Sequence, residues 1–368
     1  MFSGFLNIRK PSGVSSFDAI KIVLREILAD RKPEKRVKIG HAGTLDPLAD
    51  GVLVAAVNQA TKLISCVQNQ KKTYVATFQL GVESDSEDIE TELRPVENAK
   101  IPTQTEIESI LPEFLGTILQ RPPIYSAVHV DGKKAYKLAR KGREIEIPPR
   151  EIFIQSLKLL RYEYPTLVME IRCGSGTYIR SLGRDIARRL GTGAVMSALT
   201  RTAVGVFHIE DALEIRPNDS PEPLSQPHCL EFLRPLSDAV AGMPTVVYSA
   251  RERELLSNGI PIRLSAKRRA EIQEQIRQET CASAETAPVS PVSSIPLSDG
   301  AKTPASNEEP QAESASPETA PVPAKRPGTA PADFPKLAAM DETGQLLAVV
   351  HLCVDGKLRS DVNLAVEK

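Results

Sequence analysis

Residues 281–332 constrain the fold of this chain most, because their composition does not suit a packed domain. They contain 10 of the 29 prolines, many alanine, serine and glutamate residues, and no aromatic residue. A segment with so few large apolar side chains buries too little surface to offset the entropy lost on ordering, so we predict that it is disordered. The 368 residues therefore do not form one uninterrupted domain, and we expect folded structure on both sides of this segment.

The part of the chain before residue 240 mixes strand and helix patterns. Two amphipathic helices are predicted, one opened by a capping box of Ser15 and Asp18 and one beginning near Thr177. Strands are predicted from apolar or alternating runs at 5–8, 52–57, 73–80, 124–130, 150–160 and 166–173. Because strands and helices do not alternate regularly, the pattern predicts an α+β fold with a mixed, mostly antiparallel central sheet and flanking helices.

A second, smaller domain is predicted after a break near Pro235–Pro244. Its first elements are a strand at Thr245–Tyr248 and a short helix that Ser249 opens and Gly259 ends. Beyond the proline-rich segment, three apolar runs predict a β-meander, with turns at Asp341–Gly344 and Asp355–Gly356. We therefore place one domain at 1–240 and a small β-rich domain at 245–365, interrupted by the segment 281–332.

Composition excludes several classes of protein. The five cysteines and five histidines are scattered, with no CxxC or HExxH spacing, so we expect no disulfide framework, no metal site and no cofactor. Reduced thiols fit a cytoplasmic protein. No apolar stretch approaches the roughly 20 residues of a membrane span, and the N-terminus lacks the apolar core of a signal peptide. We therefore expect a cytoplasmic protein without membrane attachment.

Charge is distributed unevenly along the chain, although the formal net charge is only −1. Residues 1–40 carry 9 Lys or Arg against 4 Asp or Glu, and residues 121–205 carry 16 against 7. Residues 81–117 reverse the balance, with 2 basic and 10 acidic side chains. Two basic segments of this kind can present a polyanion-binding face on a protein that is neutral overall.

The densest group of residues suited to chemistry is GHAGTLDPLADG, residues 40–51. Pro47 disfavours helical backbone at Asp46, and the three glycines permit positive φ and close approach by a ligand. A carboxylate fixed on such a loop, five residues after His41, suits nucleophilic catalysis. Taken alone, an Asp-Pro pair is more often a turn in which the carboxylate binds neighbouring amides.

The whole stretch resembles, position for position, the G-H-x-G-x-L-D-P-x-A-x-G-x-L signature of bacterial tRNA pseudouridine-55 synthases, the TruB family. Six further stretches resemble motifs of that family in the expected order: KPSGVSS (10–16), ATK (60–62), KTY (72–74), RPPIYSA (121–127), CGSGTYIRSL (173–182) and LTRT (199–202). The resemblance covers about residues 1–215, too much for a chance match.

The resemblance implies the pseudouridine synthase fold and three catalytic residues. Asp46 is the nucleophile, Arg180 is the arginine that pairs with it and keeps it ionised, and Tyr74 stacks on the flipped uracil. Tyr74 is also a candidate for the base that removes the final proton. Pseudouridine formation breaks the N-glycosidic bond and rejoins the uracil through carbon, so it requires a carboxylate that stabilises or bonds to the intermediate. Whether Asp46 attacks the ribose, attacks the base or assists elimination stays open.

Five further residues are implied to bind the substrate. His41 fills the space that the flipped base vacates, and Tyr178 and Leu199 line the pocket for the base. Lys10 and Lys62 match family lysines. We assign them a role in charge and packing in preference to direct phosphate contact.

The implied partner is tRNA, bound at its T-arm, whose T-loop uridine 55 must be extruded before it can react. A thumb at about 121–150 is implied to grip the RNA backbone. It contains a basic, helix-like segment over 129–150 with Lys133, Lys134, Lys137, Arg140, Lys141, Arg143 and Arg150. Residues 245–365 resemble the PUA-like RNA-binding domain of the family. We expect a monomer that needs no obligatory protein partner.

Three other functions stay open. A guide-RNA-dependent synthase of the dyskerin branch shares the catalytic motif, although neither terminus here has the Lys-rich extension typical of that branch. An RNA-binding or tRNA-folding factor with incidental catalysis would keep the same residues. A glycosidase would need a second carboxylate as general acid, and only Asp50 accompanies Asp46 within the motif.

Overall fold

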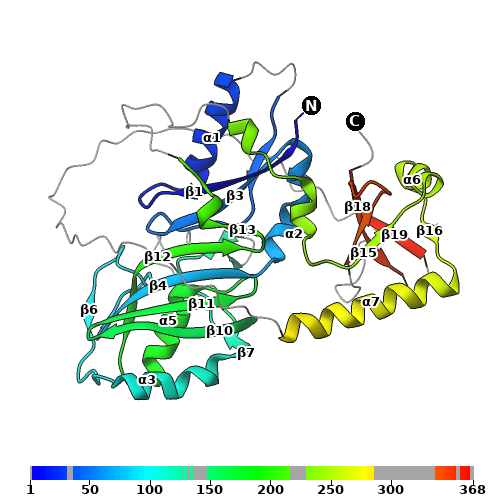
Figure 1. The fold of residues 1–368 in the computed structure, drawn as a ribbon. Coiled ribbons are helices and arrows are strands. Elements are labelled where there is room, and N and C mark those ends of the chain that lie inside the picture. Colours follow the sequence, from blue (N-terminus) through cyan, green and yellow to red (C-terminus); the bar gives the residue numbers. More distant parts are fainter. Residues whose placement is uncertain are drawn as a thin grey trace. The chain divides into compact units, whose positions relative to one another are not determined.

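The computed structural model describes residues 2–30, 36–126, 128–130, 133–135, 147–215, 229–285, 336–353 and 357–364. The chain divides into two compact units, Met1–Ala241 and Gly242–Lys368 (Figure 1).

The first unit is built on a ten-stranded sheet with the order β14-β1-β3-β12-β4-β11-β10-β7, in which β2 also pairs with β3 and β13 with β12. Among these strands, β14–β1 and β3–β12 are the parallel pairs, so the sheet is mixed and mostly antiparallel, which confirms the predicted fold class. The strands are β1 Gly4–Lys10, β2 Ile39–His41, β3 Asp50–Val57, β4 Lys72–Leu80, β7 Gly116–Gln120, β10 Arg150–Glu163, β11 Thr166–Cys173, β12 Ala194–Val204, β13 Phe207–His208 and β14 Leu213–Glu214.

Two helices with apolar stripes make the main contacts with this sheet. Helix α1 (Ser16–Asp30) packs on β1 and β3, and α5 (Ile179–Arg189) packs on β4 and β12. Figure 1 shows β4, β11 and β10 side by side, with β7 beyond them. The shorter elements of this unit are η1 Asn58–Leu63, α2 Ile64–Asn69, β5 Val82–Glu83, β6 Arg94–Pro95, α3 Gln104–Ile110, η2 Leu111–Phe114, β8 His129–Val130, β9 Lys133–Lys134, η3 Ile209–Asp211, η4 Cys229–Phe232 and η5 Leu236–Val240.

Sequence periodicity explains these elements. Ser15 caps α1 by accepting a hydrogen bond from the N–H of Asp18 (3.1 Å), as the capping box predicted. Strand β4 alternates buried and half-buried positions along its length, and its buried face includes Tyr74 and Phe78. Strand β3 is buried at every position after Asp50, because it lies between β1 and β12 inside the sheet.

Two predicted elements differ in the structure. The run 124–130 is not a strand: residues 124–126 are bends, and only His129–Val130 pair, as β8. Pro122 and Pro123 lack N–H donors, and the carbonyl of Tyr125 accepts from Arg180 instead of from a neighbouring strand (3.1 Å). The helix-like reading of 129–150 is also wrong at its ends, which form β8, β9 and the start of β10, whereas 136–146 lie outside the described residues.

The second unit contains a five-stranded sheet with the order β15-β17-β18-β19-β16. The predicted meander is present as β17, β18 and β19, and Ser249 caps α6 through a capping box with Glu252. The predicted turn at Asp355–Gly356 lies outside the described residues. The elements are β15 Thr245–Val247, α6 Ala250–Ser257, β16 Ile262–Arg263, α7 Ala266–Glu285, β17 Lys336–Met340, β18 Leu346–Leu352 and β19 Lys357–Asn363.

Helix α7 corrects the start of the segment predicted to be disordered. It continues to Glu285, so residues 281–285 are helical, while 286–332 lie outside the described residues.

Candidate active site

Asp46 lies on the loop between β2 and β3, and the start of α1 together with the turn before it holds this loop in place. Ser16 binds the backbone of Leu45 twice, because its hydroxyl accepts from the Leu45 N–H (2.8 Å) and donates to the Leu45 carbonyl (2.9 Å). The N–H of Gly13 donates to the carbonyl of Pro47 (2.8 Å). The backbone is thus anchored on both sides of Asp46, which restricts the position from which its carboxylate projects.

Arg201, from β12, holds the same loop from the sheet side. Its guanidinium is buried and donates to the carbonyls of Val52 (2.7 Å) and Gly43 (3.1 Å). Gly51 has φ +100°, and a Cβ there would lie 2.3 Å from the Arg201 carbonyl oxygen, so only glycine permits the contact. Arg201 belongs to the LTRT stretch (199–202) that resembles a family motif, yet the sequence analysis gave it no role. The neighbouring residues in the sequence do not show that its side chain reaches the Asp46 loop.

Arg180, in the first turn of α5, pairs with two carboxylates. Its Nε is 3.1 Å from Oδ2 of Asp46, and its Nη1 is 3.2 Å from Oδ2 of Asp88. It also donates to the carbonyls of Ser86 (2.7 Å) and Tyr125 (3.1 Å). The side chain of Arg180 is only 7% exposed. Its four partners, two carboxylates and two carbonyls, come from three loops and fix its position. Each carboxylate meets a single nitrogen of Arg180, so the guanidinium bridges Asp46 and Asp88.

Asp88 was missed by the sequence reasoning. It is 2% exposed at the side chain and accepts from Ser86 Oγ and from the N–H of Glu90 (3.0 Å). It lies in the acidic segment 81–117, which drew attention only for its charge. The signal that could have singled it out is the run SDSED, in which serines and aspartates alternate as in a turn stabilised by side chains.

Tyr74 and Leu199 lie in one apolar cluster with Leu45, beside the Asp46 loop. Both side chains are buried, on β4 and β12. Burial raises the pKa of Tyr74, and the positive charge of Arg201 opposes this rise only in part. The phenol is therefore neutral in this state, which suits a stacking surface better than a base.

His41 ends β2 and faces the same region as Arg201. Burial lowers the pKa of His41, and the charge of Arg201 lowers it further. Its Nδ1 is buried and has no hydrogen-bond partner among the residues that the structure describes. A neutral imidazole with an unused buried nitrogen fits a group that fills space or receives a ligand contact.

The two lysines differ. Lys10 is fully buried, and its Nζ donates to the carbonyls of Val14 (2.6 Å), Pro11 (2.9 Å) and Pro47 (3.3 Å). Burial lowers its pKa to about 8, despite the nearby carboxylates. Lys10 therefore packs beneath the Asp46 loop, whereas Lys62 lies exposed on η1.

Tyr178 is the N-cap residue of α5, half-buried and adjacent to the turn that carries Arg180. The guanidinium of Arg150 lies 4.8 Å from the centre of its ring. Arg150 was predicted to grip phosphate from a helix, but it is the first residue of β10 and is directed to this ring.

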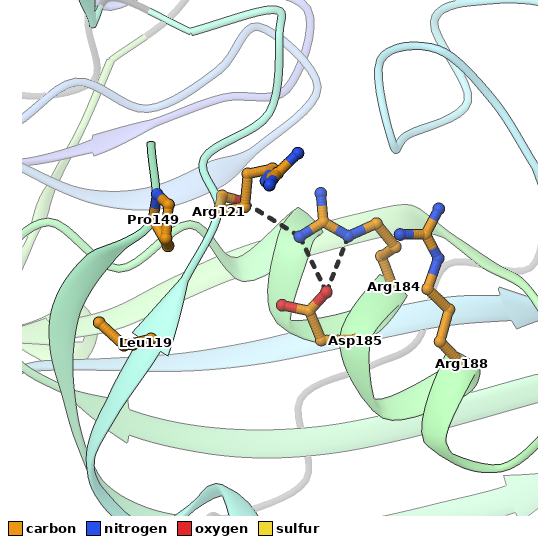
Figure 2. Close-up of a pocket in the computed structure, with 6 residues that line it drawn as sticks. All are labelled: Leu119, Arg121, Pro149, Arg184, Asp185 and Arg188. Carbon is orange, nitrogen blue, oxygen red and sulfur yellow. Dashed lines mark hydrogen bonds and ion pairs between the residues drawn. The ribbon is translucent and has the colours of Figure 1, made fainter. Parts of the chain in front are cut away.

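A hollow of about 380 Å³ lies at the end of β7 and beside α5 (Figure 2). Arg184 binds Asp185 there and donates to the carbonyl of Arg121 (3.0 Å). The hollow has more basic than acidic side chains, and its lining is Leu119, Arg121, Pro149, Arg184, Asp185 and Arg188.

Across the described ranges, no group of three or more His, Cys, Asp or Glu could hold a metal ion. No described helix is long and apolar enough to cross a membrane.

Comparison with known proteins identifies relatives in sequence. Residues 31–179 match the family described as TruB family pseudouridylate synthase, N-terminal domain. A protein of Rhodopirellula baltica named tRNA pseudouridine synthase B is 40% identical over 262 residues, which cover 70% of this chain and 75% of that protein. A protein of the same name from Dehalococcoides mccartyi strain 195 is 38% identical over 262 residues, covering 71% of this chain and 84% of the relative.

Among solved structures, a chain of a Cbf5–Nop10–Gar1 complex aligns with a TM-score of 0.59 at 20% identity, covering 98% of this chain and 84% of that chain. A Nop10–Cbf5 complex gives a TM-score of 0.57 at 18% identity, covering 99% of this chain and 86% of that chain. At such low identity the likeness shows the fold alone. It confirms the predicted pseudouridine synthase fold.

Proposed function

The chain belongs to the TruB family of pseudouridylate synthases, which isomerise uridine in tRNA, and from that premise we propose that it converts uridine 55 of the T-loop with Asp46 as nucleophile. The observation that carries the proposal is the pairing of Asp46 with Arg180 at 3.1 Å on a loop fixed from both sides. The guide-RNA-dependent alternative is not favoured, because the relatives at 38–40% identity bear the name of the tRNA enzyme.

The reaction breaks the bond between uracil N1 and ribose C1′ and forms a bond between C5 and C1′. The proton on C5 is lost and N1 gains one, so the product is an isomer and no cofactor is needed. Asp46 is 38% exposed at the side chain, which leaves a carboxylate oxygen accessible to the substrate. Arg180 orients that carboxylate through its ion pair, and a carboxylate held in place is what nucleophilic attack or stabilisation of a cleaved intermediate requires.

We assign the walls of the uracil pocket to Tyr74, Leu199 and Tyr178. Tyr74 and Leu199 offer buried apolar surface next to Leu45, the residue before Asp46. We assign Tyr74 to stacking, since its raised pKa disfavours the phenolate that a base would need. His41, neutral and unpartnered at Nδ1 among the described residues, is assigned to the space that the flipped base leaves.

We assign binding of the RNA backbone to the basic side chains near the base of the thumb. Arg121 and Arg188 line the hollow of Figure 2 and are assigned to phosphate contact, whereas Arg184 beside them is paired with Glu87 and Asp185. The predicted thumb residues Lys137, Arg140, Lys141 and Arg143 lie outside the described residues, so their part in this grip rests on sequence.

The domain assignment belongs to the same proposal. We assign 1–240 to catalysis, with the thumb at about 121–150, and 245–365 to a PUA-like RNA-binding domain whose Pro-rich interruption begins after α7. We further propose a cytoplasmic monomer that acts on tRNA without a protein partner.

The test is to incubate the purified full chain alone with an unmodified tRNA transcript and to map pseudouridine chemically. We expect a single modified position, in the T-loop, and no modification when that uridine is replaced by cytidine. Modification elsewhere would refute the assigned position. Binding and refolding of tRNA without any isomerisation would favour the tRNA-folding factor instead.

A further inference from the structure

A buried glutamine holds the peptide groups of Tyr178 from both sides. Gln120, the last residue of β7, is 1% exposed. Its Oε1 accepts from the N–H of Tyr178 (2.9 Å), and its Nε2 donates to the carbonyl of Tyr178 (3.0 Å). Only a side-chain amide supplies a donor and an acceptor side by side, so this contact specifies glutamine at position 120.

A second residue at the same place holds the ring of Tyr178. The guanidinium of Arg150 lies 4.8 Å from the ring centre, and its Nη2 donates to the carbonyl of Gly176 (2.7 Å). Gly176 has φ +81°, a left-handed conformation that glycine adopts without strain. Arg150 thus binds the face of the ring and the turn that leads into it, which a planar guanidinium does better than an ammonium group.

The two residues are partners in the sheet. Gln120 and Arg150 are opposite each other in the β7–β10 ladder, at the end where β7 finishes and β10 begins. The thumb leaves the sheet immediately after Gln120 and returns at Arg150. The pair that closes the thumb base is therefore also the pair that fixes Tyr178.

Apart from these contacts, the carbonyl of Tyr178 accepts from the N–H of Leu182 in α5 (3.0 Å). Tyr178 is the N-cap of α5 in an extended conformation (φ −95°, ψ 112°), and its side chain makes no capping hydrogen bond. Arg180 lies in the next turn, so a shift of the Tyr178 peptide also shifts the start of the helix that aims Asp46.

We propose that Gln120 and Arg150 are positioning residues, which hold Tyr178 in the uracil pocket. Because both residues lie at the base of the thumb, they also couple the position of the thumb base to the position of Tyr178. The inference rests on the proposed function, because Tyr178 is assigned to the pocket there. It goes beyond that function because it makes Gln120, which had no assigned role, and Arg150, which was assigned to gripping the RNA backbone, responsible for the geometry of the pocket.

The test is a double-mutant cycle in the full chain, read by single-turnover modification and by tRNA affinity. Gln120→Met keeps the side-chain length and removes both hydrogen bonds. We expect the rate to fall roughly 10- to 100-fold, the scale for small misplacements of a site, while tRNA affinity changes less than about twofold. In a Tyr178→Ala background the same change should cost less than in the unaltered chain, because the part of the loss that acts through the tyrosine ring is already present, whereas the part that acts through the start of α5 remains.

Controls separate positioning from simple damage. Gln155→Met makes the same replacement in β10 and should leave the rate unchanged, and thermal unfolding reports whether Gln120→Met is folded. Arg150→Lys keeps the charge and loses the planar contacts, so it should lower the rate and spare affinity. If Arg150 only gripped phosphate, this variant would modify tRNA at the normal rate.

Additive effects of Gln120→Met and Tyr178→Ala would overturn the proposal, and so would a normal rate in Gln120→Met. Absence of modification by the unaltered chain and by Gln155→Met would refute the proposed function instead. The two failures are therefore distinguishable.

Discussion

Two loops meet at Arg180, and they present carboxylates of opposite character. Asp46 and Asp88 lie 3.1 and 3.2 Å from the same guanidinium, yet the first side chain is 38% exposed and the second 2%. Asp88 is enclosed by Ser86 and the N–H of Glu90, so its lone pairs are occupied within the protein. Asp46 is fixed through its backbone and keeps its carboxylate available. The difference supports our proposal that the exposed carboxylate reacts while the buried one orients the arginine between them.

Replacing the buried carboxylate, Asp88, tests this difference between the two residues. Asp88→Asn keeps the shape and removes the charge that holds Arg180 on the side away from the substrate. We expect a rate loss of roughly 10- to 100-fold with residual activity, because the nucleophile is present but less well aimed. Asp85→Asn, on the exposed part of the same loop, is the matched control and should react normally in the single-turnover assay.

Complete loss of activity in Asp88→Asn, with intact folding, would remove the distinction between the two carboxylates.

His41 tests whether a neighbouring group takes part in bond making. Its assigned role in the flipped state is worth a few kcal/mol at most, so His41→Ala should slow modification by roughly 10- to 100-fold. Burial keeps the pKa of His41 below the ordinary 6.5, so the imidazole is predominantly neutral at and above that pH. The rate ratio of the unaltered chain to His41→Ala should therefore be constant from pH 6.5 upward.

A tRNA whose target uridine is already unstacked should recover part of the loss, and His208→Ala, at the exposed position of β13, serves as the control. A ratio that changes with pH above 6.5 would make His41 a proton carrier.

The smallest effect is expected in the second unit. Deleting residues 286–332 and joining the flanks with a short Gly/Ser linker shortens a connection between α7 and β17, which share one apolar cluster through Ile272 and Leu337. Loop-closure entropy changes slowly with length, so thermal unfolding and the single-turnover rate should match those of the full chain.

A large loss of stability would show that the segment packs, and weaker tRNA binding alone would make it an RNA-binding arm.

The sequence predicted most of the fold because periodicity is local. Capping boxes at Ser15 and Ser249 and the alternation in β4 were readable from neighbouring residues, and the structure has these elements. Strand β12 was not predicted, although it lies at the centre of the sheet between β3 and β4. The run 124–130 was misread as a strand because its carbonyl at Tyr125 binds a side chain from α5, a contact that periodicity does not encode.

The residues of the candidate site were likewise predicted only where the signal was local in the sequence. Asp46 and Arg180 were found because each stands in a recognisable motif, and the structure brings them together. Asp88, Arg201 and Gln120 were given no role, because their partners are far along the chain and become neighbours only in the fold. Lys10 could not be distinguished from a surface lysine until its burial was known.

The most direct test of the account is Asp46→Asn, measured by single-turnover modification and by tRNA binding on the same preparation. The amide keeps the size of the side chain and removes the charge needed for attack, whereas affinity comes from many phosphate contacts elsewhere. We predict no pseudouridine above background with tRNA affinity within about twofold of the unaltered chain. Pseudouridine formed by Asp46→Asn above background would contradict the assignment of Asp46 as the nucleophile.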